Sequence, residues 1–450
     1  MTVQGASDNG RVLAWRWLGL IAIVAIYVGL AVAQSYATRL QWGPDEPAHI
    51  IYVRSLATDL RFPALTHGEE DNAYLPGAAR THEAHQPPLY YALAAVVWRA
   101  CARMPDQTVS YRDRQSGELR GFSVPGQVRA VRLLSVLFGA VTLVFAWAMA
   151  RTAFPGRPEL WLVAAGLIGF TPMFTYLSGV INNDSLLALI FAATGWHWAK
   201  LLRFGTGLRE AVVAGLLVGV ALDVKETALG FVAVMLVVLA VAPGRMDRGQ
   251  RAKQMAIALA IAGAVGGWWL ARKWLVYGSP FVYPFVYPLL GLPAQERAAL
   301  AGALPRQVFL FSFIPLDVIQ AHVDIGALLR FFGGLAVLSA GGLVIWFARR
   351  KSAPAPRFET AAIAVWLLAS LVVLAGLVRN VLTVDWRMGT SGGRYLVSVM
   401  PLLAPVAARG LSALFGDGRW AKVVLAAALL GLLAVNLLVI RATALEYGTL

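Results

Sequence analysis

Long apolar runs separated by short polar connections dominate the chain from end to end. A membrane-spanning helix needs about 20 mostly apolar residues, and such runs begin near residues 15, 131, 160, 184, 208, 227, 255, 331, 359, 395 and 421. The pattern predicts an all-α polytopic membrane protein with about eleven transmembrane helices. The first run ends in Ala31-Val32-Ala33, as in a secretory signal peptide, but it has the length of a spanning helix, so we expect it to remain as an uncleaved first helix.

The segment 87–101 is ambiguous, because it is apolar but shorter than a spanning helix and opens with Pro87-Pro88. Basic residues concentrate in cytoplasmic loops. If 87–101 crossed the membrane, all later basic loops would lie outside, whereas they lie inside together if it only dips into the outer leaflet. We therefore predict one external loop over 37–128, with an amphipathic surface helix near 47–60 and a half-inserted helix at 87–101. The basic residues that set this topology are Arg11, Arg16, Arg151, Arg157, Lys200, Arg203, Arg209, Arg245, Arg248, Arg251, Lys253, Arg349, Arg350, Lys351, Arg357, Arg409, Arg419 and Lys422.

The predicted helices and loops divide the chain into three parts. Residues 1–275 form a seven-helix catalytic module that includes the external loop 37–128. Residues 276–330 form a second external loop, rich in aromatic residues and proline, and 331–450 form a C-terminal four-helix membrane region, interrupted by a third external loop at 380–394. We expect a multi-pass protein of the inner (plasma) membrane with its active site on the extracytoplasmic face.

Composition agrees with this class. The chain is 58% hydrophobic and 14% charged, with a mean hydropathy of +0.65, whereas soluble domains are about 45–50% apolar and about 25% charged. The net charge of +15 does not indicate a nucleic-acid partner, because the basic residues lie in short connections between apolar runs. Cys101 is the single cysteine, which excludes a disulfide within the chain and a multi-cysteine metal site.

The adjacent carboxylates Asp45 and Glu46 are the most informative polar feature. They lie in the sequence WGPDEPAH at 42–49, shortly after the first apolar run. Burial and mutual repulsion disfavour two ionised carboxylates at a membrane surface, so a cation, a metal or a reaction that uses a base should compensate them. A helix N-cap is the plain alternative for at least one of the two, because Pro47 suits an early helical position.

Four further polar groups fall at the outer ends of predicted helices: Asp184 in Asn-Asn-Asp, Lys225, Arg272 and Arg394. The topology rests on the basic loops alone, so this convergence is separate evidence for a site on the outer face. Each group has a structural alternative. Asp184 could be an N-cap, Lys225 could pair with a nearby acid or snorkel, and Arg272 could anchor at the interface. Two glycines before Arg394 permit a close backbone approach there.

A metal site is a weaker prediction. His82 and His85 are three residues apart and could share a divalent ion with Glu83 or Asp45. Spacing alone gives no complete ligand set, so no metal ligand is assigned and no cofactor is predicted with certainty.

Sugar transfer from a lipid-linked donor fits the whole set of polar groups. The donor phosphate needs fixed cations near the headgroup plane, which Arg and Lys supply. The acceptor hydroxyl or amine needs a base, which an external carboxylate supplies. The polyprenyl tail needs an apolar groove and the sugar needs aromatic walls. A transporter fits less well, because transporters usually place charges at the membrane midplane within repeated halves.

The ordered motifs resemble those of the GT-C membrane glycosyltransferases, in particular the superfamily of protein O-mannosyltransferases and lipid A aminoarabinose transferases. The motifs, spread over most of the chain, are the Asp45-Glu46 pair in the first external loop, HQPPLYY at 85–91, RAVRLLS at 129–135, Asn182-Asn183-Asp184, Lys225, and WWLAR at 268–272 followed by Tyr277-Gly278. Gln86 separates His85 from the prolines, which departs from the mannosyltransferase form, and no large soluble domain follows the second half, which disfavours a protein acceptor.

The resemblance implies a polyprenyl-phosphate sugar donor, a lipid or glycan acceptor, and inverting hexosyl or pentosyl transfer with Asp45 as general base. Glu46 would orient Asp45 or bind a sugar hydroxyl, and Asp184 would orient the acceptor or, if a metal is used, help to hold it. A lipid-linked-glycan flippase or transporter, or a polysaccharide polymerase or ligase with a diphosphate-linked donor, are the alternatives. The predicted substrate-binding residues are His49, His85, Tyr90, Lys225, Arg272, Arg394 and Tyr395.

Overall fold

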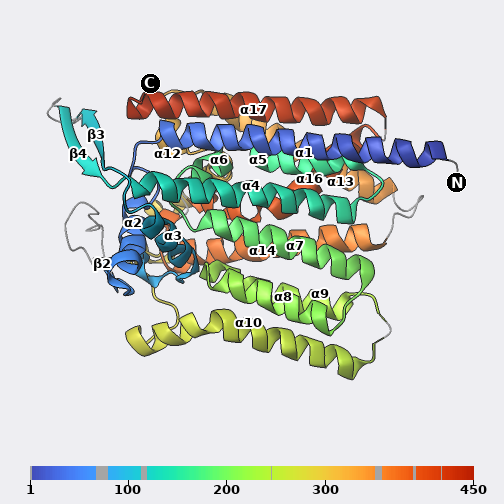
Figure 1. The fold of residues 1–450 in the computed structure, drawn as a ribbon, viewed down its shortest axis with the longest axis horizontal. Coiled ribbons are helices and arrows are strands. Elements are labelled where there is room, and N and C mark those ends of the chain that lie inside the picture. The colour runs from blue at the N-terminus through green and yellow to red at the C-terminus, as the bar shows by residue number, and fades with distance from the viewer. Residues whose placement is uncertain are drawn as a thin grey trace.

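Long helices lie side by side in one bundle, and short elements gather at one end of it (Figure 1). The computed structural model describes residues 3–66, 80–112, 119–244, 246–349, 357–388, 392–416 and 418–449. The bundle comprises α1 (Val3–Ala37), α4 (Gln127–Ala153), α5 (Pro158–Gly169), α6 (Pro172–Ser178), α7 (Asp184–Phe204), α8 (Leu208–Leu222), α9 (Leu229–Val241), α10 (Arg248–Tyr277), α13 (Ile325–Arg349), α14 (Arg357–Thr383), α16 (Met400–Leu414) and α17 (Arg419–Tyr447).

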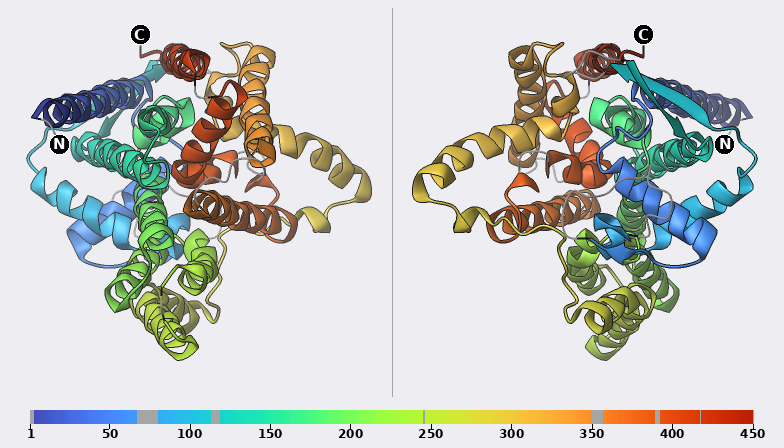
Figure 2. Two further views of the ribbon diagram at one scale, coloured as in Figure 1. Left: turned by 90° about the vertical axis from the view of Figure 1, so that its right-hand side faces the viewer. Right: turned by 90° about the vertical axis from the view of Figure 1, so that its left-hand side faces the viewer.

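The end with the short elements is called the loop end, and the opposite end, where the chain begins in Figure 1, is called the basic end. The loop end carries α2 (Glu46–Arg54), the π-helical turn η1 (Ser55–Asp59), β1 (Ala64–Leu65), β2 (Arg80–Thr81), η2 (His82–His85), α3 (Leu89–Ala100), β3 (Gln107–Arg112), β4 (Leu119–Val124), η3 (Glu226–Ala228), η4 (Leu289–Gly291), α11 (Ala294–Phe311), α12 (Leu316–Ile319) and η5 (Gly392–Val399). End-on views show α11 projecting from the side of the bundle (Figure 2).

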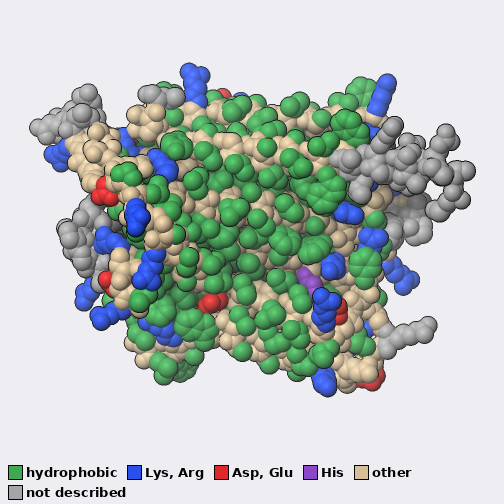
Figure 3. All heavy atoms as spheres, in the orientation of Figure 1, with side chains coloured by type: hydrophobic (Ala, Val, Ile, Leu, Met, Phe, Trp, Pro, Cys, Tyr) green, Lys and Arg blue, Asp and Glu red, His purple; other side chains and the backbone are tan. Residues whose placement is uncertain are grey.

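Charge and hydropathy divide the surface as expected for a membrane protein. A broad hydrophobic band covers the middle of the bundle, and Lys and Arg side chains flank it at both ends (Figure 3). Within the described chain, eight helices are long and apolar enough to cross a membrane, and the bent pair α5–α6 makes nine. The eleven crossings expected from sequence are not confirmed, because α8 and α9 are helices of only 15 and 13 residues.

The predicted outer helix at 87–101 is present as α3, which has 12 residues and lies at the loop end. It is too short to span an apolar core of about 30 Å at 1.5 Å per residue. Because α3 does not cross, the helix ends that carry the basic clusters all fall at the basic end, as the charge argument required. Three of the basic residues used in that argument, Arg245, Arg350 and Lys351, lie outside the described residues.

Two features of the first external loop differ from expectation. The predicted amphipathic surface helix near 47–60 is α2 with η1, but seven of the nine residues of α2 are buried, because α3 and the 80–85 segment cover the face that would meet water. The loop also contains the antiparallel hairpin β3–β4, which the all-helical pattern did not predict. Its alternating polar and apolar residues at 107–111 were the available signal.

The span near residue 160 is broken rather than straight. Pro172 lacks an N–H and begins α6, and the chain bends by 61° between α5 and α6. Polar groups from distant elements satisfy the exposed backbone. Asn436 of α17 donates from Nδ2 to the Phe170 carbonyl at 3.1 Å, and the Met173 N–H donates to the Phe313 carbonyl at 2.8 Å. These bonds explain a fully buried asparagine within an otherwise apolar helix.

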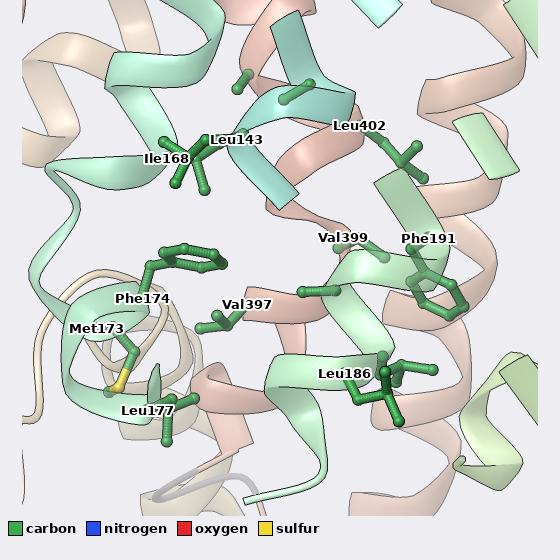
Figure 4. Packing of buried hydrophobic residues seen from close by; sticks show 14 of the residues in the cluster. Leu143, Ile168, Met173, Phe174, Leu177, Leu186, Phe191, Val397, Val399 and Leu402 are labelled. Carbon is green, nitrogen blue, oxygen red and sulfur yellow. The ribbon is translucent and has the colours of Figure 1, made fainter. Parts of the chain in front are cut away.

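Apolar packing ties the two halves of the chain into one core. Figure 4 shows Leu143 of α4, Phe174 of α6 and Leu186 of α7 gathered around Val397 of η5 and Leu402 of α16. The residues before Arg394 are held equally closely, since a Cβ on Gly393 would collide with the backbone of α11 at Val308 and Ser312. The close approach expected of the glycines there is therefore present, and it fixes the position of Arg394.

Candidate active site

Asp45 lies at the N-cap position of α2 with a left-handed backbone, φ +54°. Its side chain makes no capping hydrogen bond. The carboxylate instead pairs with the guanidinium of Arg394, and 35% of the side chain is accessible. A non-glycine residue at positive φ is uncommon and tends to occur at functional sites. Asp45 therefore occupies the N-cap position, but its carboxylate pairs with Arg394 and does not cap the helix.

Electrostatics keep Asp45 ionised. Burial acts to raise the pKa of Asp45, but the Arg394 guanidinium, assisted by His82, holds that pKa well below its usual range. His82 Nε2 lies 3.7 Å from Asp45 Oδ1. The carboxylate is therefore a stable anion and a weak base for as long as Arg394 remains its partner.

Glu46 points the other way, into the core. Both of its oxygens accept hydrogen bonds from Arg132 of α4, at 2.7 and 2.6 Å, and neither side chain is exposed. The backbone N–H groups of Ile181 and Gly43 donate to the same carboxylate at 3.0 and 3.2 Å. Arg132 also donates to three backbone carbonyls, those of Ser35, Thr38 and Arg39. Glu46 therefore joins four segments of the chain and is not placed to orient Asp45 or to touch a sugar.

Glu46→Gln is expected to destabilise the protein by about 3–5 kcal/mol, because it leaves the buried Arg132 charge without its anion. Thermal unfolding in detergent measures this effect. Asp324→Asn is the matched control, because Asp324 forms an exposed pair with Arg330 at 3.8 Å, and such pairs contribute about 0–1 kcal/mol. Equal unfolding temperatures for the two variants would contradict the structural role of Glu46.

A second ion pair lies beside the first. Lys225 Nζ is 2.6 Å from Asp184 Oδ1 and 3.4 Å from Asn183 Oδ1. Lys225 lies 4.8 Å from the centroid of the Tyr395 ring, and the Arg394 guanidinium lies 5.2 Å from the same centroid. The cations of the two cation–carboxylate pairs therefore both lie against the ring of Tyr395. The structure brings together Asp45, Asp184, Lys225, Arg394 and Tyr395, which come from four distant parts of the chain.

A buried cluster behind Asp45 contains Glu83, His49 and Tyr91. The Tyr91 hydroxyl donates to Glu83 Oε2 at 3.2 Å, and His49 Nδ1 lies 2.9 Å from the same hydroxyl. Since the hydroxyl proton is used on Glu83, His49 Nδ1 is the donor to Tyr91. Burial lowers the pKa of His49 to about 3 despite Asp45 nearby, so His49 is neutral. His49 is buried behind Asp45, so it supports the site from below and is not exposed on the site's open face.

Burial raises the pKa of Glu83 to about 7, although His82 opposes the shift. A carboxyl group with a raised folded-state pKa stabilises the fold fully below its unfolded pKa, here about 4.5, and this stabilisation is lost as pH rises through about 7. The unfolding temperature of the wild type should therefore fall relative to that of Glu83→Gln from about pH 5 to about pH 8. Parallel pH profiles for the two proteins would show that Glu83 is ionised throughout.

His85 lies at the other side of the 80–85 segment. Its Nδ1 is 2.7 Å from the His82 carbonyl, which can only accept, so Nδ1 carries the proton and Nε2 is an acceptor. Burial and the nearby Lys273 lower the pKa of His85 to about 3, against the effect of that hydrogen bond. The indole of Trp269 donates to the His85 carbonyl at 3.0 Å. His85 is half-buried and presents a neutral imidazole.

Arg272 is separate from the two ion pairs. Its guanidinium lies 4.6 Å from the centroid of the Phe62 ring and 4.7 Å from that of Trp269. Its Nη1 is buried with no hydrogen-bond partner among the described residues. Three cations were expected to bind a phosphate together. Lys225 and Arg394 do lie together, whereas Arg272 lies apart, against the rings of Phe62 and Trp269. The next residue, Lys273, pairs with Glu226.

Tyr90 is fully buried, contrary to its predicted place in substrate binding. Its hydroxyl lies 2.9 Å from Ser135 Oγ and accepts from the Asn182 N–H at 3.1 Å. Tyr90 thereby fixes the turn that presents Asp184. Sequence reasoning gave no role to Tyr91 or Arg132, although it recognised the motifs HQPPLYY and RAVRLLS that contain them. It considered Glu83 only as a possible metal ligand.

No group of three or more His, Cys, Asp or Glu side chains is arranged to hold a metal ion in the part of the chain that the structure describes. His85 Nδ1 donates to the His82 carbonyl, so this nitrogen is not available to share a metal ion with His82. The arrangement offers two acids, two fixed cations and an aromatic wall.

Comparison with known proteins bears on the fold of the chain. The family model described as dolichyl-phosphate-mannose-protein mannosyltransferase matches residues 122–269. ArnT from Cupriavidus metallidurans, solved bound to undecaprenyl phosphate, superposes with a TM-score of 0.51 at 15% identity, covering 96% of this chain and 75% of ArnT. The oligosaccharyltransferase AglB from Archaeoglobus fulgidus, solved with an inhibitory peptide and a dolichol-phosphate, gives 0.52 at 15% identity, covering 96% of this chain and 56% of AglB. No curated protein matches the sequence.

The chain is therefore a multi-pass membrane protein with the GT-C glycosyltransferase fold. It spans three quarters of the length of ArnT and just over half that of AglB.

Proposed function

We propose that the protein transfers a sugar from a polyprenyl-phosphate donor to a lipid or glycan acceptor at the loop end of the bundle. The single observation that carries this proposal is the pairing of two carboxylates with two cations around Tyr395. Asp45, whose side chain is 35% accessible, would act on an acceptor, and the two cations would hold a phosphate. The matched mannosyltransferase family model and the lipid phosphates bound in the two similar structures support the choice of donor.

Donor binding would change the partner of Arg394. A phosphate is a better bidentate partner for a guanidinium than one carboxylate oxygen, so the donor phosphate would take Arg394 and Lys225 and release Asp45. Loss of the adjacent positive charge raises the basicity of a carboxylate. In this way Asp45 would become a competent base only after the donor is in place, which protects the donor from premature reaction.

The chemical step is a displacement at the anomeric carbon. Asp45 takes the proton of the acceptor O–H or N–H, and the acceptor atom forms a bond to the anomeric carbon. The bond from that carbon to the phosphate oxygen breaks, and its electron pair leaves on the polyprenyl phosphate, where Arg394 and Lys225 stabilise the charge. One displacement inverts the anomeric configuration. Asp184 would orient the acceptor, because its partner Lys225 lies against the same Tyr395 ring as Arg394, the partner of Asp45.

The aromatic wall that lies beside the two ion pairs would bind the sugar. Phe62 and Trp269 present aromatic faces, Arg272 contributes a guanidinium with an unused N–H, and His85 Nε2 can accept from a sugar hydroxyl. By the distribution of basic residues, the loop end would face the extracytoplasmic side of the inner membrane.

Transfer of radiolabel from a synthetic polyprenyl-phosphate sugar to extracted membrane lipids and glycans tests the proposal. Transfer from the monophosphate donor and not from a polyprenyl-diphosphate oligosaccharide is the expected result. Transfer only from the diphosphate donor would favour a polymerase or ligase. Movement of the lipid-linked sugar across proteoliposomes without any transfer product would favour a flippase and would contradict the proposed reaction.

A further inference from the structure

A groove with basic and aromatic walls lies at the basic end, far from the two ion pairs. It is a hollow of about 520 Å³ that is open to solvent between the ends of α4, α5 and α7. Three tryptophans and three cations are among the side chains that line it: Trp147, Trp161, Trp196, Arg151, Lys200 and Arg203. No step of the proposed transfer uses any of them.

The cations of this groove contact aromatic rings and, in the described part of the protein, are not paired with carboxylates. Arg151 lies 5.2 Å from the centroid of the Trp147 ring, and Lys200 lies 4.8 Å from that of Trp196. Arg203 Nη1 donates to the Thr152 carbonyl at 2.9 Å. No carboxylate lines the groove, and none of the three cations forms an ion pair with a carboxylate of the described residues. Three uncompensated positive charges around one hollow attract an anion.

The groove continues into an apolar stripe that would face the lipid. Leu133, Leu137 and Val144 are exposed on α4, and they share a helical face with Ala148 and Arg151 of the groove wall. Lys and Arg side chains flank the hydrophobic band at this end of the molecule (Figure 3). A ligand that carries a negative headgroup and apolar chains would match both the groove and the stripe.

We propose that this groove binds the headgroup of one anionic glycerophospholipid from the membrane leaflet at the basic end, with its acyl chains along the exposed face of α4. Basic pockets between membrane helices are suited to anionic headgroups. The bound lipid would join α4 to α7, which also carries Asp184 at its opposite end. The site is independent of the proposed transfer reaction, and its occupancy can be measured without any activity assay.

Native mass spectrometry of the full chain in neutral detergent tests the proposal, with phosphatidylglycerol and phosphatidylcholine of the same acyl chains as probes. One phosphatidylglycerol should bind preferentially. The variant Arg151→Gln/Lys200→Gln should weaken that binding roughly tenfold or more, since each cation near a membrane surface contributes measurably to anionic lipid affinity. Arg203 is left intact because it also holds α7 to α4.

Lys253→Gln/Lys422→Gln is the matched control, because it removes the same charge from two exposed side chains at the same end that do not line the groove. It should bind phosphatidylglycerol as the wild type does, and so should the charge-conserving variant Arg151→Lys/Lys200→Arg. Equal binding of the two lipids, or an unchanged preference in the Arg151/Lys200 variant, would overturn the proposal. Displacement of phosphatidylglycerol by equimolar inorganic phosphate would indicate a free-anion site instead and would overturn it as well.

Discussion

Asp45→Asn is expected to lower the rate of sugar transfer roughly 1000-fold, within the range of about 10²–10⁴ that general-base catalysis contributes. Asparagine keeps the shape of the side chain but cannot take a proton. In the proposed mechanism Asp45 competes with the donor phosphate for Arg394, so the variant should bind polyprenyl phosphate at least as tightly as the wild type. The loss should therefore appear in kcat and not in donor affinity.

Initial-rate kinetics together with a polyprenyl-phosphate binding assay separate these two effects. Asp324→Asn is a suitable control, because it removes a carboxylate from an exposed arginine pair on the same end of the molecule. Full activity in Asp45→Asn would exclude Asp45 as the base. A parallel loss of donor binding would show instead that Asp45 holds the site together.

Arg394→Gln should produce the second-largest effect, a loss of roughly 10²–10³ in kcat/KM, comparable to removal of one charge-stabilising donor in other enzymes. Here donor binding should weaken as well, since in the proposed mechanism the guanidinium contacts the phosphate both in the bound donor and in the leaving group. Arg394→Lys should recover part of the affinity but not the bidentate geometry.

Arg330→Gln is the matched control, because Arg330 is the exposed ion-pair partner of Asp324. This variant also loses a guanidinium and should leave the kinetics unchanged. Lys225→Gln should resemble Arg394→Gln, because both cations border the same ring. If donor affinity survived in Arg394→Gln and in Lys225→Gln, the phosphate would bind elsewhere, and Arg272 would be the next cation to test.

The end of the bundle at which the basic loops lie could be predicted from sequence, although the number of crossings could not. Basic residues concentrate in the connections at one end of the bundle. One misassigned crossing would place all later basic connections at the other end, and on that ground the sequence assigned α3 as a helix that does not cross. The hairpin β3–β4 was missed, because two short strands in a chain of apolar runs give a weak periodic pattern.

The site was predictable only where position alone decides function. Helix-end residues such as Asp184 and Lys225 meet because helix ends meet, whatever the details of packing. The division of labour between Asp45 and Glu46 could not be predicted. Adjacent residues point in different directions, and the partner that claims Glu46 is an arginine on the buried side of α4, 86 residues away in sequence.

The same limit applies to Glu83 and Tyr90. The raised pKa of Glu83 depends on burial by segments that are distant in sequence. The tyrosine pair at 90–91 read as one aromatic motif, yet Tyr90 supports the Asp184 turn while Tyr91 holds His49 and Glu83.

The central claim is that a lipid phosphate binds between Arg394 and Lys225 and frees Asp45. A density map of the protein with bound polyprenyl phosphate tests it most directly. The phosphate should lie within hydrogen-bonding distance of both cations, with Arg394 no longer paired with Asp45 and the Asp45 carboxylate facing the open side of the site. A phosphate bound at the basic end, or an Asp45–Arg394 pair that stays intact beside a bound donor, would contradict the account.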